Sequence, residues 1–320
     1  MNVALGFLLL AGAFMLAGQF GLKSAEWPRR APRLGIALWQ ALSGATVVSL
    51  LLACVALTLP GMSVVETLGE IIRVCVVELS HQYSSVAGAV VSSLGIVLLS
   101  ILFGRLARAL WSRQQEAKRT RTRHLTALAR VARPTGDNVF HLDHDAAAVY
   151  CVADPRRGPA TGAVVVTRGA REALTHEQLG LVLRHERAHL RSRHDRLVLR
   201  SRALADALPW LPFFRTVHEQ ISSLVEMHPD DAVPPKDRPT LAVALYRLAG
   251  GGTAGAPSGA LGASGAGATM RARRLVLPYV PLGRTSVALV VAAIFAVGAA
   301  PAALALVPSD DTLFHNCCVQ

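Results

Sequence analysis

The sequence predicts an α-helical membrane protein with four transmembrane helices and one mainly α, α+β domain between the third and fourth helix. Of its 320 residues, 52% are hydrophobic and only 17% are charged, whereas soluble globular proteins carry about 25% charged residues. Several long stretches contain no charged residue at all, and about 20 apolar residues in a helix cross the core of a bilayer. The composition therefore argues against a wholly soluble chain and against a disordered one.

The predicted spans are four apolar stretches, at about residues 3–22, 35–60, 86–104 and 284–308. The first could instead be a cleaved signal peptide, but such a peptide starts with basic residues, and here they follow the apolar stretch. These spans divide the chain into a membrane part (1–104), a domain with a basic start (105–248), a Gly- and Ala-rich linker (249–283), the fourth span and a short external tail (309–320). We expect the linker to be flexible, because its residues bury little apolar area.

The basic residues predict the orientation of the spans, since Lys and Arg accumulate in cytoplasmic loops. The connector after the first span has four basic residues and one acidic residue, whereas the connector after the second has three acidic residues and one basic residue. Nine basic residues follow the third span, within 105–133. We therefore expect a multi-pass protein of the plasma membrane with an external N-terminus and a cytoplasmic domain. The basic stretch would also suit nucleic-acid phosphates, but facing the lipid bilayer requires only the same charge, and we expect no direct nucleic-acid partner.

A helix with a metal-binding pattern is predicted from Thr175 to Leu190. Thr175 and Gln178 form a capping box, which marks the start of a helix. On this helix His185 and His189 are four residues apart and share one face, so that their imidazoles can occupy two corners of a zinc tetrahedron. Glu186 lies beside the first ligand, where a carboxylate can take a proton from metal-bound water. The pattern is HExxH, and it predicts Zn²⁺ as the cofactor.

The third zinc ligand does not follow from the same helix. In the extended motif HExxHxxGxxH the last His is a ligand, but Ser192 and Asp195 stand here at the Gly and His positions. On an unbroken helix neither His194 nor Asp195 can point at the metal. A second amphipathic helix is predicted from Arg215 to Met227, and its acidic residues are Glu219 and Glu226.

Three segments give the chain a family resemblance: RHERAHLRSRHD (184–195), PWLPF (209–213) and EMHPD (226–230). With three spans before the domain and one after it, the sequence resembles the BlaR/MecR family of integral-membrane zinc metallopeptidases, which are gluzincins. The resemblance implies a zincin-like cytoplasmic peptidase domain, Glu226 as the third zinc ligand and Asp230 as the residue that orients a ligating His. Pro229, Pro234 and Pro235 depart from the expected helix. We also expect no C-terminal penicillin-binding sensor domain, because few residues follow the fourth span.

Before the HExxH helix, an apolar strand resembles the edge strand to which substrates of zincins add. We expect it to bind the substrate through Ala163, Val164, Val165, Val166 and Thr167, with a turn at Arg168–Gly169. A second polar cluster comprises His141, Asp143, His144 and Asp145, which we interpret as a loop before a strand at Ala148–Val152. We assign no role to the five cysteines, Cys54, Cys75, Cys151, Cys317 and Cys318.

These features predict a membrane-embedded zinc endopeptidase with a cytoplasmic active site. By resemblance its substrate is a cytosolic repressor of the winged-helix type, which makes it an antirepressor. Two alternatives remain: a quality-control protease of the HtpX type, and a signalling scaffold that binds zinc without turnover. Glu186 separates the scaffold from the proteases, because a scaffold has no use for a general base.

Overall fold

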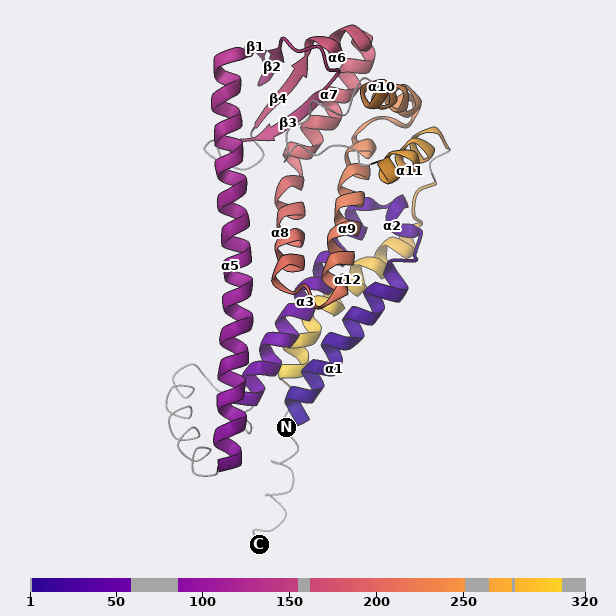
Figure 1. Ribbon diagram of the computed structural model, residues 1–320. Coiled ribbons are helices and arrows are strands. Elements are labelled where there is room, and N and C mark those ends of the chain that lie inside the picture. The colour runs from indigo at the N-terminus through magenta and orange to yellow at the C-terminus, as the bar shows by residue number, and fades with distance from the viewer. Residues whose placement is uncertain (1, 59–85, 155–161, 251–264, 278–279, 307–320) are drawn as a thin grey trace. The chain divides into compact units, whose positions relative to one another are not determined.

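The computed structural model describes residues 2–58, 86–154, 162–250, 265–277 and 280–306 (Figure 1). Over these residues the chain is mostly helical, with one small sheet. It forms two compact units. The first comprises Met1–Ala25, Ala37–Arg108 and Arg284–Gln320, and the second comprises Glu26–Ile36 and Ala109–Gly283.

Among the described residues, four helices are long and apolar enough to cross a membrane. They are α1 (Asn2–Leu16) with its π-helical continuation η1 (Ala17–Leu22), α3 (Pro32–Thr58), α5 (Val86–Val131) and α12 (Arg284–Ala305). All four predicted stretches therefore contain such a helix. The helix that contains the third predicted span, α5, continues unbroken beyond it to Val131, because the Arg, Ala, Gln and Lys residues after the apolar stretch also favour helix. The predicted external tail lies outside the described residues.

The second unit contains a four-stranded sheet in the order β1-β2-β4-β3. Its strands are β1 (Arg133–Gly136), β2 (Val139–Leu142), β3 (Val149–Ala153) and β4 (Gly162–Thr167). β4 pairs parallel with β2 and antiparallel with β3. The prediction of an edge strand at Ala163–Thr167 is therefore wrong: the strand is central and buried, which suits its uninterrupted apolar run. The edge on this side is β3, and the predicted strand at Ala148–Val152 is confirmed within one residue.

The other helices described in the second unit are α2 (Trp27–Arg30), α6 (Arg168–Ala173), α7 (His176–Arg191), α8 (His194–Ala207), α9 (Pro212–Met227), α10 (Arg238–Gly250) and α11 (Gly265–Val276), with the short 3₁₀ turns η2 (Pro229–Ala232) and η3 (Pro235–Asp237). Of these, α6 and α7 pack on the sheet, α10 packs on α7, and α8, α11 and α2 pack on α9. The turn predicted at Arg168–Gly169 is the start of α6. The core joins the sheet to α6 and α7, with Val166 and Ala170 both fully buried.

The predicted flexible linker contains a helix. Residues 265–276 form α11, whose Leu275 is buried with Leu181 of α7 and Leu241 of α10. The physical reason is composition, since Gly, Ala and Ser dominate only up to about residue 269 and Arg and Leu follow. The preceding stretch, 251–264, lies outside the described residues.

Candidate metal centre

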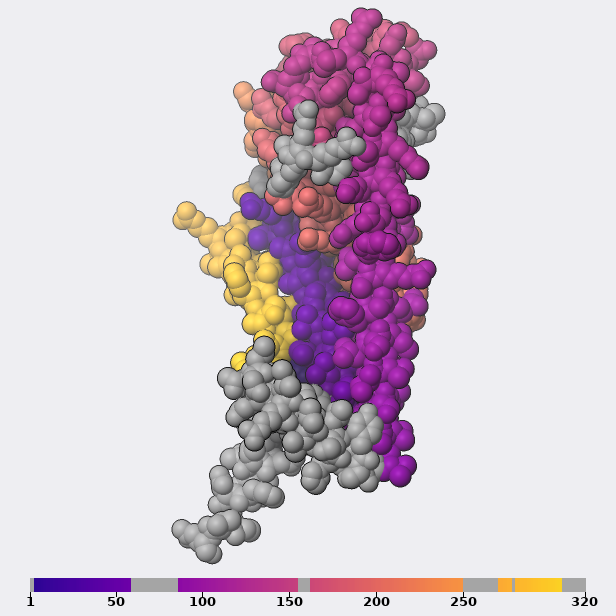
Figure 2. All heavy atoms as spheres, turned by 90° about the vertical axis from the view of Figure 1, so that its left-hand side faces the viewer, coloured from indigo at the N-terminus to yellow at the C-terminus, as the bar shows by residue number. Residues whose placement is uncertain are grey.

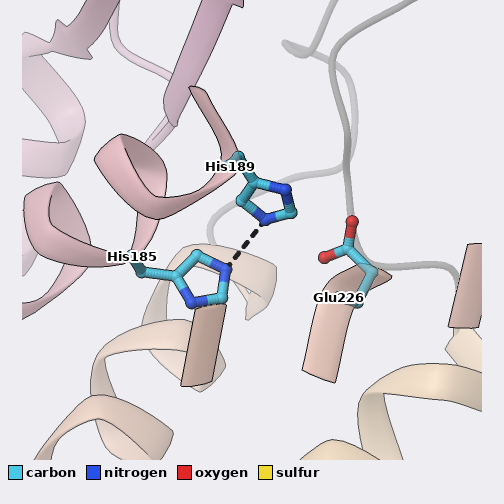
Figure 3. A group of neighbouring side chains, drawn as sticks. All are labelled: His185, His189 and Glu226. Carbon is cyan, nitrogen blue, oxygen red and sulfur yellow. Dashed lines mark hydrogen bonds between the residues drawn. The ribbon is translucent and has the colours of Figure 1, made fainter. Parts of the chain in front are cut away.

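The helix α7 holds two histidines side by side. Its capping box is present as predicted, because the Thr175 hydroxyl accepts from the backbone N–H of Gln178 and the Gln178 side chain accepts from that of Thr175. One turn apart on the same face, His185 and His189 are both 2% exposed, and their Nε2 atoms lie 3.2 Å apart (Figure 3). Two ligands of a tetrahedral zinc ion lie about 3.4 Å apart, given bonds of about 2.0–2.1 Å. The spacing of the two nitrogens therefore suits a shared metal.

Glu226 completes a set of three potential ligands. It lies in the last turn of α9, and its carboxylate faces the two imidazoles in Figure 3. One ligand atom from each of the three residues lies within 4.8 Å of the others. The structure thus brings together the three residues predicted to bind zinc, and a possible metal-binding group exists here.

Asp230 lies behind His185, where the resemblance predicted an orienting carboxylate. α9 ends at Met227, and the 3₁₀ turn η2 that follows directs the fully buried Asp230 back toward α7. Its Oδ1 is 3.1 Å from His185 Nδ1, the ring nitrogen turned away from His189. Burial raises the pKa of Asp230, but His185 and Arg271 outweigh burial and hold the pKa below its usual value. Pro229 thus starts a 3₁₀ turn where a continued helix was expected, and the Asp230 carboxylate still lies beside His185.

Glu186 is buried beside the ligands. Its Oε2 atom has no hydrogen-bond partner among the described residues. Burial raises the pKa of Glu186 to about 7, against the opposing effect of His185 and with a further contribution from Glu226. A carboxylate with a pKa near 7 can accept a proton and return it at neutral pH.

Two further histidines, His194 and His228, lie beyond His189; the sequence indicated His194 only as a rejected zinc ligand and gave no role to His228. His194 is fully buried, with Nδ1 3.0 Å from His189 Nδ1 and Nε2 2.8 Å from His228 Nδ1. On an unbroken helix His194 cannot point at the metal, but Arg193 adopts a left-handed conformation (φ 51°) that separates α7 from α8, and His194 contacts the outer nitrogen of His189. Burial, with smaller effects of His228 and His185, lowers the pKa of His194 to about 3, so that it stays neutral. It therefore holds the outer nitrogen of His189 without adding charge.

Arg271 of α11 is a further residue of the site that the sequence did not indicate. Its guanidinium is buried, with Nη1 3.0 Å from Glu226 Oε2 and Nη2 3.0 Å from Asp230 Oδ1. Nη2 also lies 3.3 Å from His185 Nε2. A cation of the chain thus contacts two of the three potential ligands. No signal in the sequence suggested this, because Arg271 lies in the predicted linker, 45 residues after Glu226.

A cleft of about 510 Å³ lies next to His189. Its walls come from the edge strand β3, from α8 and from the charged half of α5, and Figure 2 shows α5 (magenta) on the surface. Val152, Leu190 and Val198 give it an apolar lining. Two ion pairs between α5 and α8 cross its border, Arg121–Asp195 at 2.9 Å and Arg113–Asp206 at 2.8 Å. The cleft therefore offers an apolar space beside a strand edge and a potential metal ligand.

The remaining predicted polar residues have other surroundings. Asp143 and Asp145 form ion pairs with Arg168 on the surface, and no metal-binding group is found around them within the described ranges. His141 lies in β2 rather than in a loop. Cys151 lies in β3 and lines the cleft, and burial raises the pKa of its thiol, with Glu186 adding to the effect.

Comparison of the chain with protein-family models, with curated proteins and with solved structures gave no match.

Proposed function

We propose that this protein is a membrane-embedded zinc endopeptidase whose active site faces the cytoplasm. The observation that carries the proposal is the joint position of His185, His189 and Glu226 around one point, with Glu186 buried beside them. Two imidazole nitrogens and one carboxylate oxygen form the donor set of catalytic zinc sites, which leave the fourth position to water. The four apolar helices and the loop charges support the membrane location and the orientation.

In this proposal Glu186, Asp230 and His194 have separate roles in the reaction. A bound Zn²⁺ supplies a Lewis acid for the scissile carbonyl and lowers the pKa of water. Glu186 accepts the proton from the attacking water and passes it to the nitrogen of the leaving amine. Asp230 holds His185 by its outer nitrogen, and His194 does the same for His189. Each ligating ring thereby keeps the orientation that the site requires.

The substrate binds along β3 in this proposal, not along β4. An edge strand offers unpaired N–H and C=O groups to an extended peptide, and β4 has none to offer because it is paired on both sides. The adjoining cleft then receives one side chain of the substrate. Its lining by Val152, Leu190 and Val198 favours an apolar side chain there.

We expect Val198→Arg to block cleavage of an apolar peptide while leaving the metal bound. Val198 lines the cleft from α8, and an arginine there would fill the apolar space with a charged side chain. Cleavage of fluorogenic peptides and zinc content would be measured on the same preparations. The matched control is Val243→Arg on α10, where the side chain is already 45% exposed. Unchanged cleavage in Val198→Arg would remove the cleft from the substrate site.

The proposed physiological substrate is a cytosolic repressor, most simply a small winged-helix protein, so that cleavage acts as antirepression. This part of the proposal rests on the resemblance to the BlaR/MecR family. We expect cells that carry Glu186→Gln to accumulate one full-length repressor that cells with the wild-type protein degrade. Comparison of the two cytosolic proteomes tests this. If misfolded membrane proteins accumulate instead, the HtpX-type alternative replaces antirepression, and if nothing changes, the zinc-binding scaffold does.

A further inference from the structure

A second hollow of about 360 Å³ lies between α2, α11 and the end of α9, away from the cleft. Its lining includes Arg29, Arg30, Arg273 and Arg274 and a single acidic residue, Glu26. We propose that this hollow binds the headgroup phosphate of an anionic phospholipid. The proposal rests on the membrane location given under the proposed function, and it adds a ligand that the peptidase chemistry does not require.

Arg274 gives the hollow a fixed frame. It donates from Nε to the backbone oxygen of Arg29 (2.8 Å), from Nη1 to that of Met227 (3.2 Å) and from Nη2 to Asp231 Oδ1 (2.6 Å). One side chain therefore ties α2, the end of α9 and the η2 turn to α11. The N–H donors of Arg274 are engaged in these contacts. We therefore expect the exposed guanidinium groups of Arg29 and Arg273 to bind the ligand.

Apolar side chains adjoin these cations. Met227 is buried at the hollow, whereas Met270, Leu277 and Val280 are 38%, 50% and 59% exposed. An inorganic phosphate has no use for apolar surface, but a phospholipid presents a charged phosphate next to acyl chains. The pairing of guanidinium groups with exposed apolar side chains thus points to a lipid rather than to a free anion.

The chain itself keeps the hollow close to a membrane. Arg29 precedes Pro32, the start of the second candidate span, by three residues, and Val280 precedes Arg284, the start of the fourth, by four. A residue spans at most about 3.6 Å, so both lie within roughly 15 Å of the end of a span. Headgroups occupy several ångströms on each side of the hydrocarbon core. Since anionic lipids are enriched in the cytoplasmic leaflet, toward which the loop charges orient these residues, a lipid phosphate can reach the hollow.

The test uses the full-length protein reconstituted into vesicles of phosphatidylcholine and phosphatidylglycerol in equal amounts, followed by extraction and mass spectrometry of the retained lipids. We expect wild-type protein to retain phosphatidylglycerol selectively. The double variant Arg29→Gln/Arg273→Gln should lose that preference by about thirtyfold, since each of the two basic residues near the surface contributes on the order of 1 kcal/mol. The control Arg119→Gln/Arg123→Gln removes two exposed charges from α5, outside the hollow, and should keep the preference.

Equal loss in both double variants would overturn the proposal in favour of non-specific attraction. Displacement of phosphatidylglycerol by millimolar inorganic phosphate would contradict the proposal that a lipid is the ligand, because it would show that the hollow binds a free anion. Insertion of the protein without any preference for phosphatidylglycerol would refute this proposal alone. Failure of the protein to insert into vesicles would refute the proposed membrane location as well. Thermal unfolding of each variant, compared with that of the wild type, shows whether a loss reflects binding or folding.

Discussion

Glu186→Gln is expected to lower peptide cleavage by roughly 10²–10⁴-fold, the usual contribution of a general acid–base group, while zinc stays bound. Glutamine has nearly the same shape but cannot take up the proton of the attacking water. The residue is assigned proton transfer rather than ligation, because the ligand atoms come from His185, His189 and Glu226. The measurement is the cleavage rate together with zinc content per chain.

The matched control for this variant is Glu177→Gln, which changes an exposed glutamate in the first turn of the same helix. It should keep both activity and zinc. Loss of zinc from Glu186→Gln would contradict the assigned role, since it would make Glu186 part of the metal-binding set. Full activity with zinc bound would move the general base elsewhere.

Arg271→Gln is expected to tighten zinc binding by roughly ten- to a hundredfold, since a hydrogen bond to a charged group contributes about 1.5–3 kcal/mol. The Arg271 guanidinium contacts Glu226 Oε2 and lies 3.3 Å from His185 Nε2. Zinc bound to these atoms would face a second cation at short range, so the guanidinium and the metal compete for the same donors. Zinc affinity, measured by competition with a chromophoric chelator, tests this.

Arg274→Gln serves as the control for Arg271→Gln. It lies on the same helix and binds Asp231, but it does not contact any of the three potential ligands. Its zinc affinity should stay near that of the wild type. Weaker zinc binding in Arg271→Gln would contradict the competition and would show instead that the guanidinium supports Glu226 and Asp230.

The sequence predicted those parts of the site that depend on local pattern. The capping box at Thr175 and the four-residue spacing of His185 and His189 define a helix and one of its faces, and both are present as predicted. Glu226 and Asp230 came from the resemblance alone, since many acidic residues could follow an HExxH helix. The structure places both residues beside the histidines.

The features that escaped prediction depend on contacts between distant segments or on unusual backbone. An apolar run such as Ala163–Thr167 fits a strand at either place in a sheet, and only the pairing partners make β4 central. Arg193 adopts a left-handed conformation, which usually requires a glycine. The sequence therefore did not predict the break before His194 or the contact of His194 with His189. Arg271 follows a stretch whose composition suggests no fold, and its role arises only from the packing of α11.

The central claim is that His185, His189 and Glu226 together hold zinc, and zinc content per chain tests it most directly. Wild type, Glu226→Ala and Glu219→Ala would be purified in parallel and analysed by mass spectrometry of the metal. Glu219 is the matched control, because it is an exposed glutamate on the same helix α9. The account predicts about one zinc per chain in wild type and Glu219→Ala, the complement of one three-ligand site, and a large loss in Glu226→Ala. Equal zinc in all three proteins would contradict it.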